Sequence, residues 1–378
     1  MRILLHIGQS KTGSSAIQAY LTLNRERLYR EGIVYSGVSI SGFTVDFGNH
    51  NIVADAPTGL LRYPYLTADQ YFEQFYCHAK RIGAERLILS AEHFFGGEPR
   101  VWNVPDEKSY FERYREKVDS LAQYVSGHEV TLFLYLRPQI EWLASAISQT
   151  VRIERLISPG KPIYHDDEQF FELVKPLLGY CTLLDLWTES LRPHDVIIVP
   201  YMRKNLRDQS TIADFLYRAN VEGFTFPYGS EGVRVNTSLS REYIEVKKIL
   251  NRTFKSETEE QTIIACLERL SSRKDRFVPY RLSDDLSQKV EAIVMAENTK
   301  LNEHYIKDAP QMKARDPESQ SHYPETMGKK DIAAAMAEFK REYARPATRL
   351  RMLDYAIRAG LREHARPVQS VLHQLKRA

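Results

Sequence analysis

The segment RILLHIGQSKTGSSAIQAYL (residues 2–21) decides the fold class of this chain. It begins with a short apolar run, Arg2–Ile7, which predicts a buried β-strand. A polar stretch bounded by glycines follows at Gly8–Gly13, and apolar residues then recur at helical spacing from residue 14 to residue 30. A strand, a glycine-bounded loop and a helix in this order bring backbone amides and a helix N-terminus to one point, which favours binding of an anion.

The same alternation of strands and helices continues through the first 225 residues. Apolar runs predict strands over 86–90, 130–136 and 195–201, and helical spacing predicts helices over 67–82, 110–125, 139–151, 169–191 and 211–219. Unbroken apolar strands that alternate with helices are typical of a parallel sheet covered on both faces. We therefore expect an α/β fold: a P-loop-like parallel β-sheet flanked by helices, with an additional helical C-terminal region.

The remainder of the chain predicts helices and no further central strand. The helices are expected over 241–251, 257–272, 283–306, 331–343 and 349–361. The predicted domains are an α/β domain over 1–306 (mainly helical from 225 to 306), a polar linker or exposed loop over 307–328, and a basic helical extension over 329–378.

The composition restricts the class of partner. Of the 378 residues, 43% are hydrophobic and 27% charged, which is typical of a soluble globular protein and excludes wholesale disorder. The net charge of +3 is too close to zero to favour nucleic acid as a partner. Basic residues are concentrated in a tail, residues 341–378, for which three roles stay open: packing on the body, pairing with another subunit, or peripheral contact with an acidic polymer or membrane surface. Packing is the favoured role.

The sequence predicts a cytoplasmic protein without a transmembrane segment. Its longest apolar run, Val130–Leu136, is far shorter than the roughly 20 residues that a spanning helix needs, and the N-terminus lacks the features of a signal peptide. Cys77, Cys181 and Cys266 are scattered and odd in number. We therefore expect neither a disulfide framework nor a metal site.

The glycine-bounded loop has the frame of a nucleotide-binding P-loop, but its lysine is displaced. Four residues separate Gly8 from Gly13, and in nucleoside-triphosphate hydrolases a lysine follows the second glycine. Here Ser14 takes that position, and the lysine is Lys11, inside the loop. The pattern predicts an anion site without Mg²⁺-dependent hydrolysis of a nucleoside triphosphate. The alternative is a tight turn with a surface lysine.

A second segment, TLFLYLRPQIEWLASAISQ (residues 131–149), predicts a second anion site. Arg137 ends a predicted strand, and Ser145 lies two turns into the following helix. Ligands of open parallel sheets bind beyond the C-terminal ends of the strands, so Arg137 and the loop should share one edge. A guanidinium and a hydroxyl suit a phosphate, and two such sites imply a ligand with two phosphate-like groups. Alternatively, Arg137 forms a structural ion pair and Ser145 is simply a small buried residue.

Together, HIGQSKTGSSAIQAYL and LYLRPQIEWLASAISQ resemble the two signature segments of sulfotransferases that use 3′-phosphoadenosine 5′-phosphosulfate (PAPS). The resemblance is strongest to bacterial carbohydrate sulfotransferases and extends, more weakly, over about residues 1–306. It implies that Thr12, Gly13, Ser14 and Ser15 hold the 5′-phosphosulfate. It assigns the 3′-phosphate to the Arg137 and Ser145 pair. The family often has KTGTT where this chain has KTGSS, a change that keeps the hydroxyl.

The resemblance also implies a mechanism that needs no metal ion. Lys11 would stabilise the negative charge that develops on the phosphate of the leaving group, which is 3′,5′-adenosine bisphosphate. The acceptor needs a general base. In LILSAEHFF (residues 87–95), Glu92 matches the glutamate of an LSSE-like strand end in related carbohydrate enzymes, and we favour it as the base. His93 is the second candidate, and a capping or loop-fixing role is the alternative for both.

Four further residues are weaker candidates. His50 is expected near the acceptor, or else bonds locally within its loop. Tyr201 follows a strand and is expected near the adenosine, with ordinary packing as the alternative. Arg234 and Asn236 precede a helix and could reach the ligand, although helix capping is favoured for this segment.

The predicted function is therefore transfer of a sulfuryl group from PAPS to a hydroxyl, or an amine, of a carbohydrate or glycolipid. Two alternatives stay open. A P-loop kinase or NTPase would bind ATP with Mg²⁺, although Ser14 in the lysine position disfavours it. A non-catalytic nucleotide-binding protein would bind the nucleotide without transfer.

Overall fold

The structure is a computed structural model that describes residues 1–35, 38–40, 43–45, 50, 67–96, 106–157, 164–221, 238–252, 256–273, 277–306, 310–316 and 327–345. Some predicted features lie outside these ranges. They are the helix over 349–361 with most of the basic tail, most of the 307–328 linker, and the candidates Arg234 and Asn236.

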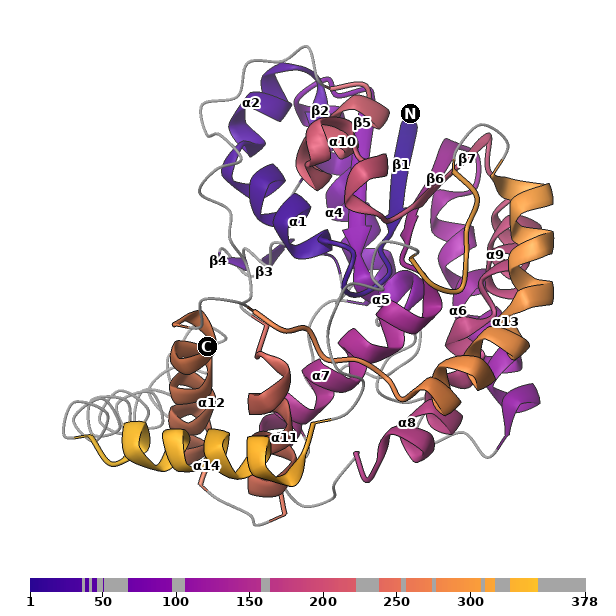
Figure 1. The fold of residues 1–378 in the computed structure, drawn as a ribbon. Helices are drawn as coiled ribbons and strands as arrows, with labels where there is room; N and C mark the ends of the chain where they lie inside the picture. Colours follow the sequence, from indigo (N-terminus) through magenta and orange to yellow (C-terminus); the bar gives the residue numbers. More distant parts are fainter. Residues whose placement is uncertain are drawn as a thin grey trace. The chain divides into compact units, whose positions relative to one another are not determined.

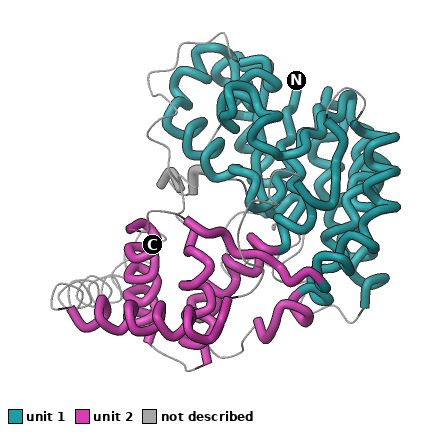
Figure 2. Tube along the Cα trace, viewed as in Figure 1, with its two compact units in different colours: residues 1–143, 171–235, 285–320 teal, residues 144–170, 236–284, 321–378 magenta. Residues whose placement is uncertain are grey.

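The chain forms two compact units, each built from three segments and each described here by itself (Figure 2). Unit 1 consists of Met1–Leu143, Phe171–Val235 and Asp285–Gln320. Unit 2 consists of Ala144–Phe170, Asn236–Asp284 and Ser321–Ala378. The predicted domain over 1–306 therefore contributes residues to both units.

Unit 1 contains a five-stranded parallel sheet with the strand order β2-β5-β1-β6-β7 (Figure 1). The strands are β1 (Arg2–Ile7), β2 (Ile33–Val34), β5 (Arg86–Ala91), β6 (Glu129–Leu136) and β7 (Asp195–Pro200). The predicted α/β class with a parallel sheet is confirmed. The two-residue strand β2 was not predicted, and neither was a separate antiparallel pair, β3 (Val38–Ile40) and β4 (Phe43–Val45).

Helices flank this sheet. Those of unit 1 are α1 (Ser14–Leu23), α2 (Arg25–Arg30), α4 (Ala68–Arg81), α5 (Glu92–Phe95), α6 (Glu107–Val125), α9 (Tyr180–Leu191), α10 (Thr211–Arg218) and nearly all of α13 (Asp284–Tyr305). On one face, α1 and α10 pack over side chains such as Phe133 and Tyr135, both fully buried. Figure 1 shows α6 and α9 side by side on the other face, and a hydrogen bond of 2.8 Å from Trp187 to Tyr114 joins them. Burial on both faces explains why the strands are continuous apolar runs.

The helix predicted over residues 14–30 is interrupted at Asn24. The Asn24 side chain is buried and donates from Nδ2 to the carbonyl of Tyr20 at 3.0 Å, and its backbone amide bonds to the same oxygen. A side chain that bonds to the backbone in this way competes with the next helical turn. The segment therefore folds as α1 and α2, separated by one residue.

Unit 2 is helical in its described part. It contains α11 (Arg241–Leu250), α12 (Glu257–Ser272) and α14 (Lys329–Tyr343), with most of α7 (Gln139–Ile157) and the first half of α8 (Asp167–Val174). Helix α14 packs on α11 and α12, and Glu342 near its end accepts hydrogen bonds from Arg269 and Arg273 at 2.8 and 3.0 Å. Among the described helices, none is both long and apolar enough to cross a membrane.

Candidate functional site

The loop between β1 and α1 has a backbone that only particular residues tolerate. Gly13 has a φ of 83°, in the left-handed region, and a Cβ there would also meet Thr211 at 3.1 Å. A Cβ at Gly8 would meet the Ser14 hydroxyl at 2.7 Å. Lys11 adopts a φ of 69° despite carrying a side chain. Non-glycine residues held in this region cluster at functional sites, so the loop tip is a candidate site.

The start of α1 supplies hydrogen-bond donors that the described part of the chain does not use. The backbone amides of Gly13, Ser14 and Ser15 have no acceptor among the described residues, and no side chain caps this end of the helix. Within the loop, Thr12 instead donates its hydroxyl to the carbonyl of Gln9 at 2.6 Å, which fixes the turn. Open amides at a helix start whose first turn carries no acidic residue of its own form a favourable site for an anion.

Arg137 lies at the same edge of the sheet as the loop, as the sequence predicts. Its guanidinium donates from Nη1 to the carbonyl of Lys11 at 3.4 Å. Burial lowers the pKa of this guanidinium, while the nearby Glu141 and Asp316 carboxylates act in the opposite direction. A half-buried cation in contact with the loop backbone can pair with a ligand anion through charge-assisted hydrogen bonds.

Three hydrogen bonds join Arg137, the loop and helix α9 into a closed ring. The Arg137 amide donates to the Gln9 side chain at 2.7 Å, Gln9 donates to the Tyr180 hydroxyl at 2.7 Å, and that hydroxyl donates to the Arg137 carbonyl at 2.9 Å. Gln9 and Tyr180 are buried. Sequence reasoning missed both residues. Gln9 lies inside the loop motif but is not one of the glycines that define it. No local sequence pattern connects Gln9 with Tyr180, 171 positions away.

Tyr201 is also close to the loop. Its hydroxyl lies 3.2 Å from the Thr211 hydroxyl and 3.3 Å from where a Cβ of Gly13 would stand. Its ring meets that of Tyr135 edge-on. Ser145 is half-buried on α7 in unit 2, so the predicted pairing with Arg137 stays a prediction.

Glu92 faces the first turn of α1. It begins α5 directly after β5, and its Oε1 accepts from the Ser15 hydroxyl at 3.4 Å. Burial raises the pKa of this carboxyl, and the charges of Lys11 and His93 partly oppose the rise. A carboxylate that is hydrogen-bonded weakly and has a raised pKa suits proton transfer.

The two histidine candidates have different surroundings. His93 follows Glu92 on α5, and its carbonyl accepts a hydrogen bond from the Lys117 ammonium. His50 is buried between the rings of Tyr35 and Phe75, and its Nδ1 accepts from the Ser90 amide at 3.0 Å. These contacts hold the end of β5, and the predicted contact of His50 with an acceptor stays a prediction.

A buried histidine that the sequence did not reveal supports the same strand end. The Nδ1 atom of His6 lies 2.8 Å from the Ser90 hydroxyl, which also accepts from Gln18 at 3.1 Å. Burial lowers the pKa of His6 from 6.5 to about 3, so the ring is neutral near pH 7. Ser90 precedes Glu92 by two residues, and His6 and His50 both hold Ser90 in position.

Comparison with known proteins adds no assignment, because no family model, curated protein or solved structure matches this chain. The site combines open amides and a lysine on a strand–loop–helix connection, a half-buried arginine bonded to that loop, and a carboxylate within reach of the first helical turn.

Proposed function

We propose that the protein is a PAPS-dependent sulfotransferase that acts on a carbohydrate or glycolipid acceptor. The observation that carries the proposal is the contact of Arg137 with the Lys11 carbonyl, because it brings two anion-binding groups to one sheet edge. A donor nucleotide with a 5′-phosphosulfate and a 3′-phosphate matches two such groups. The open amides of Gly13, Ser14 and Ser15 fit the first anion, and the Arg137 guanidinium fits the second.

The β1–α1 connection is P-loop-like in its glycine spacing, but it departs from the nucleoside-triphosphate type. Ser14 stands where the β/γ-phosphate lysine is required, and Lys11 lies in the loop instead. This arrangement supports transfer of a sulfuryl group over cleavage of a β/γ-phosphate bond.

The chemistry proposed for the site is an in-line displacement. Glu92 takes the proton of the acceptor hydroxyl, whose oxygen forms a bond to sulfur. The bond from sulfur to the phosphate oxygen breaks, its electron pair stays on that oxygen, and 3′,5′-adenosine bisphosphate leaves. Lys11 and the loop amides stabilise the charge that develops there. Because Glu92 acts as the carboxylate and its pKa is raised, turnover should increase with pH through the titration of that carboxyl.

The test is a thermal-shift comparison of 3′,5′-adenosine bisphosphate with 5′-AMP and with ATP and Mg²⁺. A saturating ligand at about 100 times its Kd adds roughly 2.7 kcal/mol of stability. The bisphosphate should stabilise the protein more than AMP does, and Arg137→Met should remove that difference. The matched control is Arg115→Met, an exposed arginine of unit 1 paired with Glu189. A shift with ATP and Mg²⁺ alone would contradict the proposal and favour a kinase or NTPase.

The general base is tested separately by transfer of labelled sulfate to a panel of sugars. Glu92→Gln should abolish transfer while leaving bisphosphate binding intact, and His93→Ala should retain transfer. Full turnover by Glu92→Gln would exclude Glu92 as the base. Binding without transfer by the unmodified protein across the panel would favour a non-catalytic nucleotide-binding role.

A further inference from the structure

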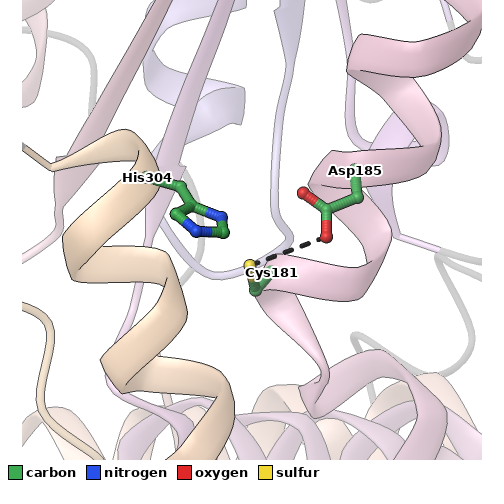
Figure 3. A group of neighbouring side chains, drawn as sticks. All are labelled: Cys181, Asp185 and His304. Carbon is green, nitrogen blue, oxygen red and sulfur yellow. Dashed lines mark hydrogen bonds between the residues drawn. The ribbon is translucent and has the colours of Figure 1, made fainter.

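Three potential metal ligands meet between α9 and α13. Cys181 and Asp185 lie one turn apart on α9, and His304 lies on the last turn of α13 (Figure 3). One ligand atom of each residue, a thiol sulfur, a carboxylate oxygen and a ring nitrogen, lies within 4.8 Å of the others. The figure shows the three side chains directed into one space between the two helices. Sequence spacing could not reveal this group, because the histidine comes from a distant helix.

The neighbours of this group orient its ligands. Tyr305 donates its hydroxyl to Asp185 Oδ1 at 2.6 Å, which leaves Oδ2 directed at the Cys181 thiol, 3.8 Å away. The Tyr305 hydroxyl is also 3.1 Å from that of Thr188. In protein metal sites, ligating carboxylates are held by hydrogen bonds of this kind. Tyr305 thus fixes the carboxylate in an orientation that suits coordination.

The charges around the thiol favour a cation. The carboxylates of Asp185 and Glu297 both act on Cys181 and outweigh the ammonium of Lys300. Glu297 is held in place by the amide and hydroxyl of Thr182 at 3.0 and 3.1 Å.

We propose that Cys181, Asp185 and His304 bind a divalent ion of the zinc class, with water in the fourth position. One sulfur, one nitrogen and one oxygen ligand match the donors that Zn²⁺ takes in proteins. Bond lengths of about 2.0–2.3 Å place tetrahedral ligand atoms roughly 3.4 Å apart. Closing the present separations of up to 4.8 Å to that value requires rotation of the side chains, and the His304 side chain is exposed. The bound ion would join α9 to α13. The proposal does not depend on sulfuryl transfer.

The test is binding of Co²⁺ and Zn²⁺ to the untagged, full-length protein. Co²⁺ bound to a thiolate gives a near-ultraviolet charge-transfer absorption and visible bands whose intensity reports tetrahedral geometry. We expect one equivalent of Co²⁺ to produce both, and one equivalent of Zn²⁺ to displace it. Cys181→Ser should remove the charge-transfer band, and Asp185→Asn and His304→Ala should each weaken Zn²⁺ binding more than about tenfold. Tyr305→Phe should weaken it by about tenfold.

The controls separate this site from adventitious binding. Cys77→Ser, which removes the exposed cysteine, should leave the spectrum and the affinity unchanged. Because Cys181→Ser alters a buried position, His304→Ala, at an exposed position, serves as the second variant. Circular dichroism checks that this variant retains its fold. An absent charge-transfer band, or a band that persists in Cys181→Ser, would overturn the proposal. So would His304→Ala with wild-type affinity.

Discussion

A lysine and a glutamate are neighbours in both units, but the two pairs have opposite surroundings. In unit 2, Lys247 and Glu260 are 0% and 2% exposed, and the lysine donates to both Glu260 and Asn251. In unit 1, Lys11 is only half-buried on a left-handed loop tip, and its charge acts on Glu92 without a direct ion pair between the two in the described contacts.

This difference separates charges that hold a fold from charges that serve a ligand. A buried pair whose hydrogen bonds are made within the fold has no donor or acceptor available for a ligand. Removing one member leaves the other charge buried and unpaired. Around the loop, the backbone amides at the start of α1 are open, and the Glu92 carboxylate accepts a long hydrogen bond of 3.4 Å from Ser15. Substitutions should therefore act on stability in unit 2 and on chemistry in unit 1.

The largest effect is expected from Lys247→Met. Because it leaves the Glu260 carboxylate buried without its partner, we expect unit 2 to lose about 3–5 kcal/mol of unfolding free energy. Urea unfolding followed by circular dichroism measures it. The double variant Lys247→Met/Glu260→Met should recover most of the loss, and Lys340→Met, at an exposed position of α14, should change stability by less than about 0.5 kcal/mol. If Lys247→Met and Lys340→Met lowered the unfolding free energy equally, the interpretation of Lys247 and Glu260 as a buried pair that stabilises the fold would be contradicted.

The next largest effect is expected from Lys11→Gly. Loss of the cation at the leaving oxygen should lower kcat for sulfate transfer by about 10²–10³-fold. The unfolding free energy should not fall, because glycine adopts the left-handed φ of 69° without strain. Lys108→Gly, at an exposed position in the first turn of α6, is the reverse control, with unchanged kcat and an unfolding free energy lower by up to about 1 kcal/mol. If Lys11→Gly lowered both the unfolding free energy and kcat, the distinction between charges that hold the fold and charges that serve a ligand would be contradicted.

A smaller effect on the unfolding free energy, confined to acidic pH, is expected from His6. The unfolded chain binds a proton at this ring below pH 6.5, whereas the folded ring stays neutral down to about pH 3. Stability is therefore lost as the pH falls through this window. By pH 4.5, the loss from His6 should be about 2.7 kcal/mol. His6→Asn removes the titration, so its stability deficit relative to the wild type should shrink by that amount between pH 7.5 and pH 4.5. A constant deficit would exclude this role.

The smallest effect is expected from Tyr180→Phe, which opens the ring of hydrogen bonds around Arg137. Loss of two hydrogen bonds of about 1 kcal/mol each should weaken bisphosphate binding by up to roughly 30-fold. Because only the position of Arg137 changes, 5′-AMP should bind as before. Isothermal titration with the two nucleotides measures the ratio, and Tyr217→Phe, at an exposed position, is the control. A uniform loss for both nucleotides would indicate a general change in the fold instead.

The sequence predicted the central strands because their apolar runs are continuous. The predicted β1 has the bounds Arg2–Ile7 that the structure shows, and β6 begins one residue before the predicted start, at Glu129. Strand β2 has only two residues, too few for any periodicity to be visible. The break at Asn24 depends on one side chain that bonds to the turn before it, and helical spacing does not register such a contact.

The candidate site was predictable only where its residues lie in local motifs. Lys11 lies in the loop that follows one recognisable strand and Arg137 directly follows another, so their shared edge follows from the topology of a parallel sheet. Gln9, Tyr180 and His6 act through contacts between residues 43 to 171 positions apart. Such contacts depend on the folded packing, and no spacing in a single sequence encodes them.

The place of β1 in the sheet has a consequence for biosynthesis. It is the middle strand, and both of its partners follow it in the chain: Leu4 pairs with Ile88 on one side and with Thr131 on the other. At synthesis rates of about 5–20 residues per second, this apolar strand waits on the order of 10 s before both neighbours exist. During that interval its two edges are open to other chains, so the nascent protein should depend on ribosome-associated chaperones more than its finished fold would suggest.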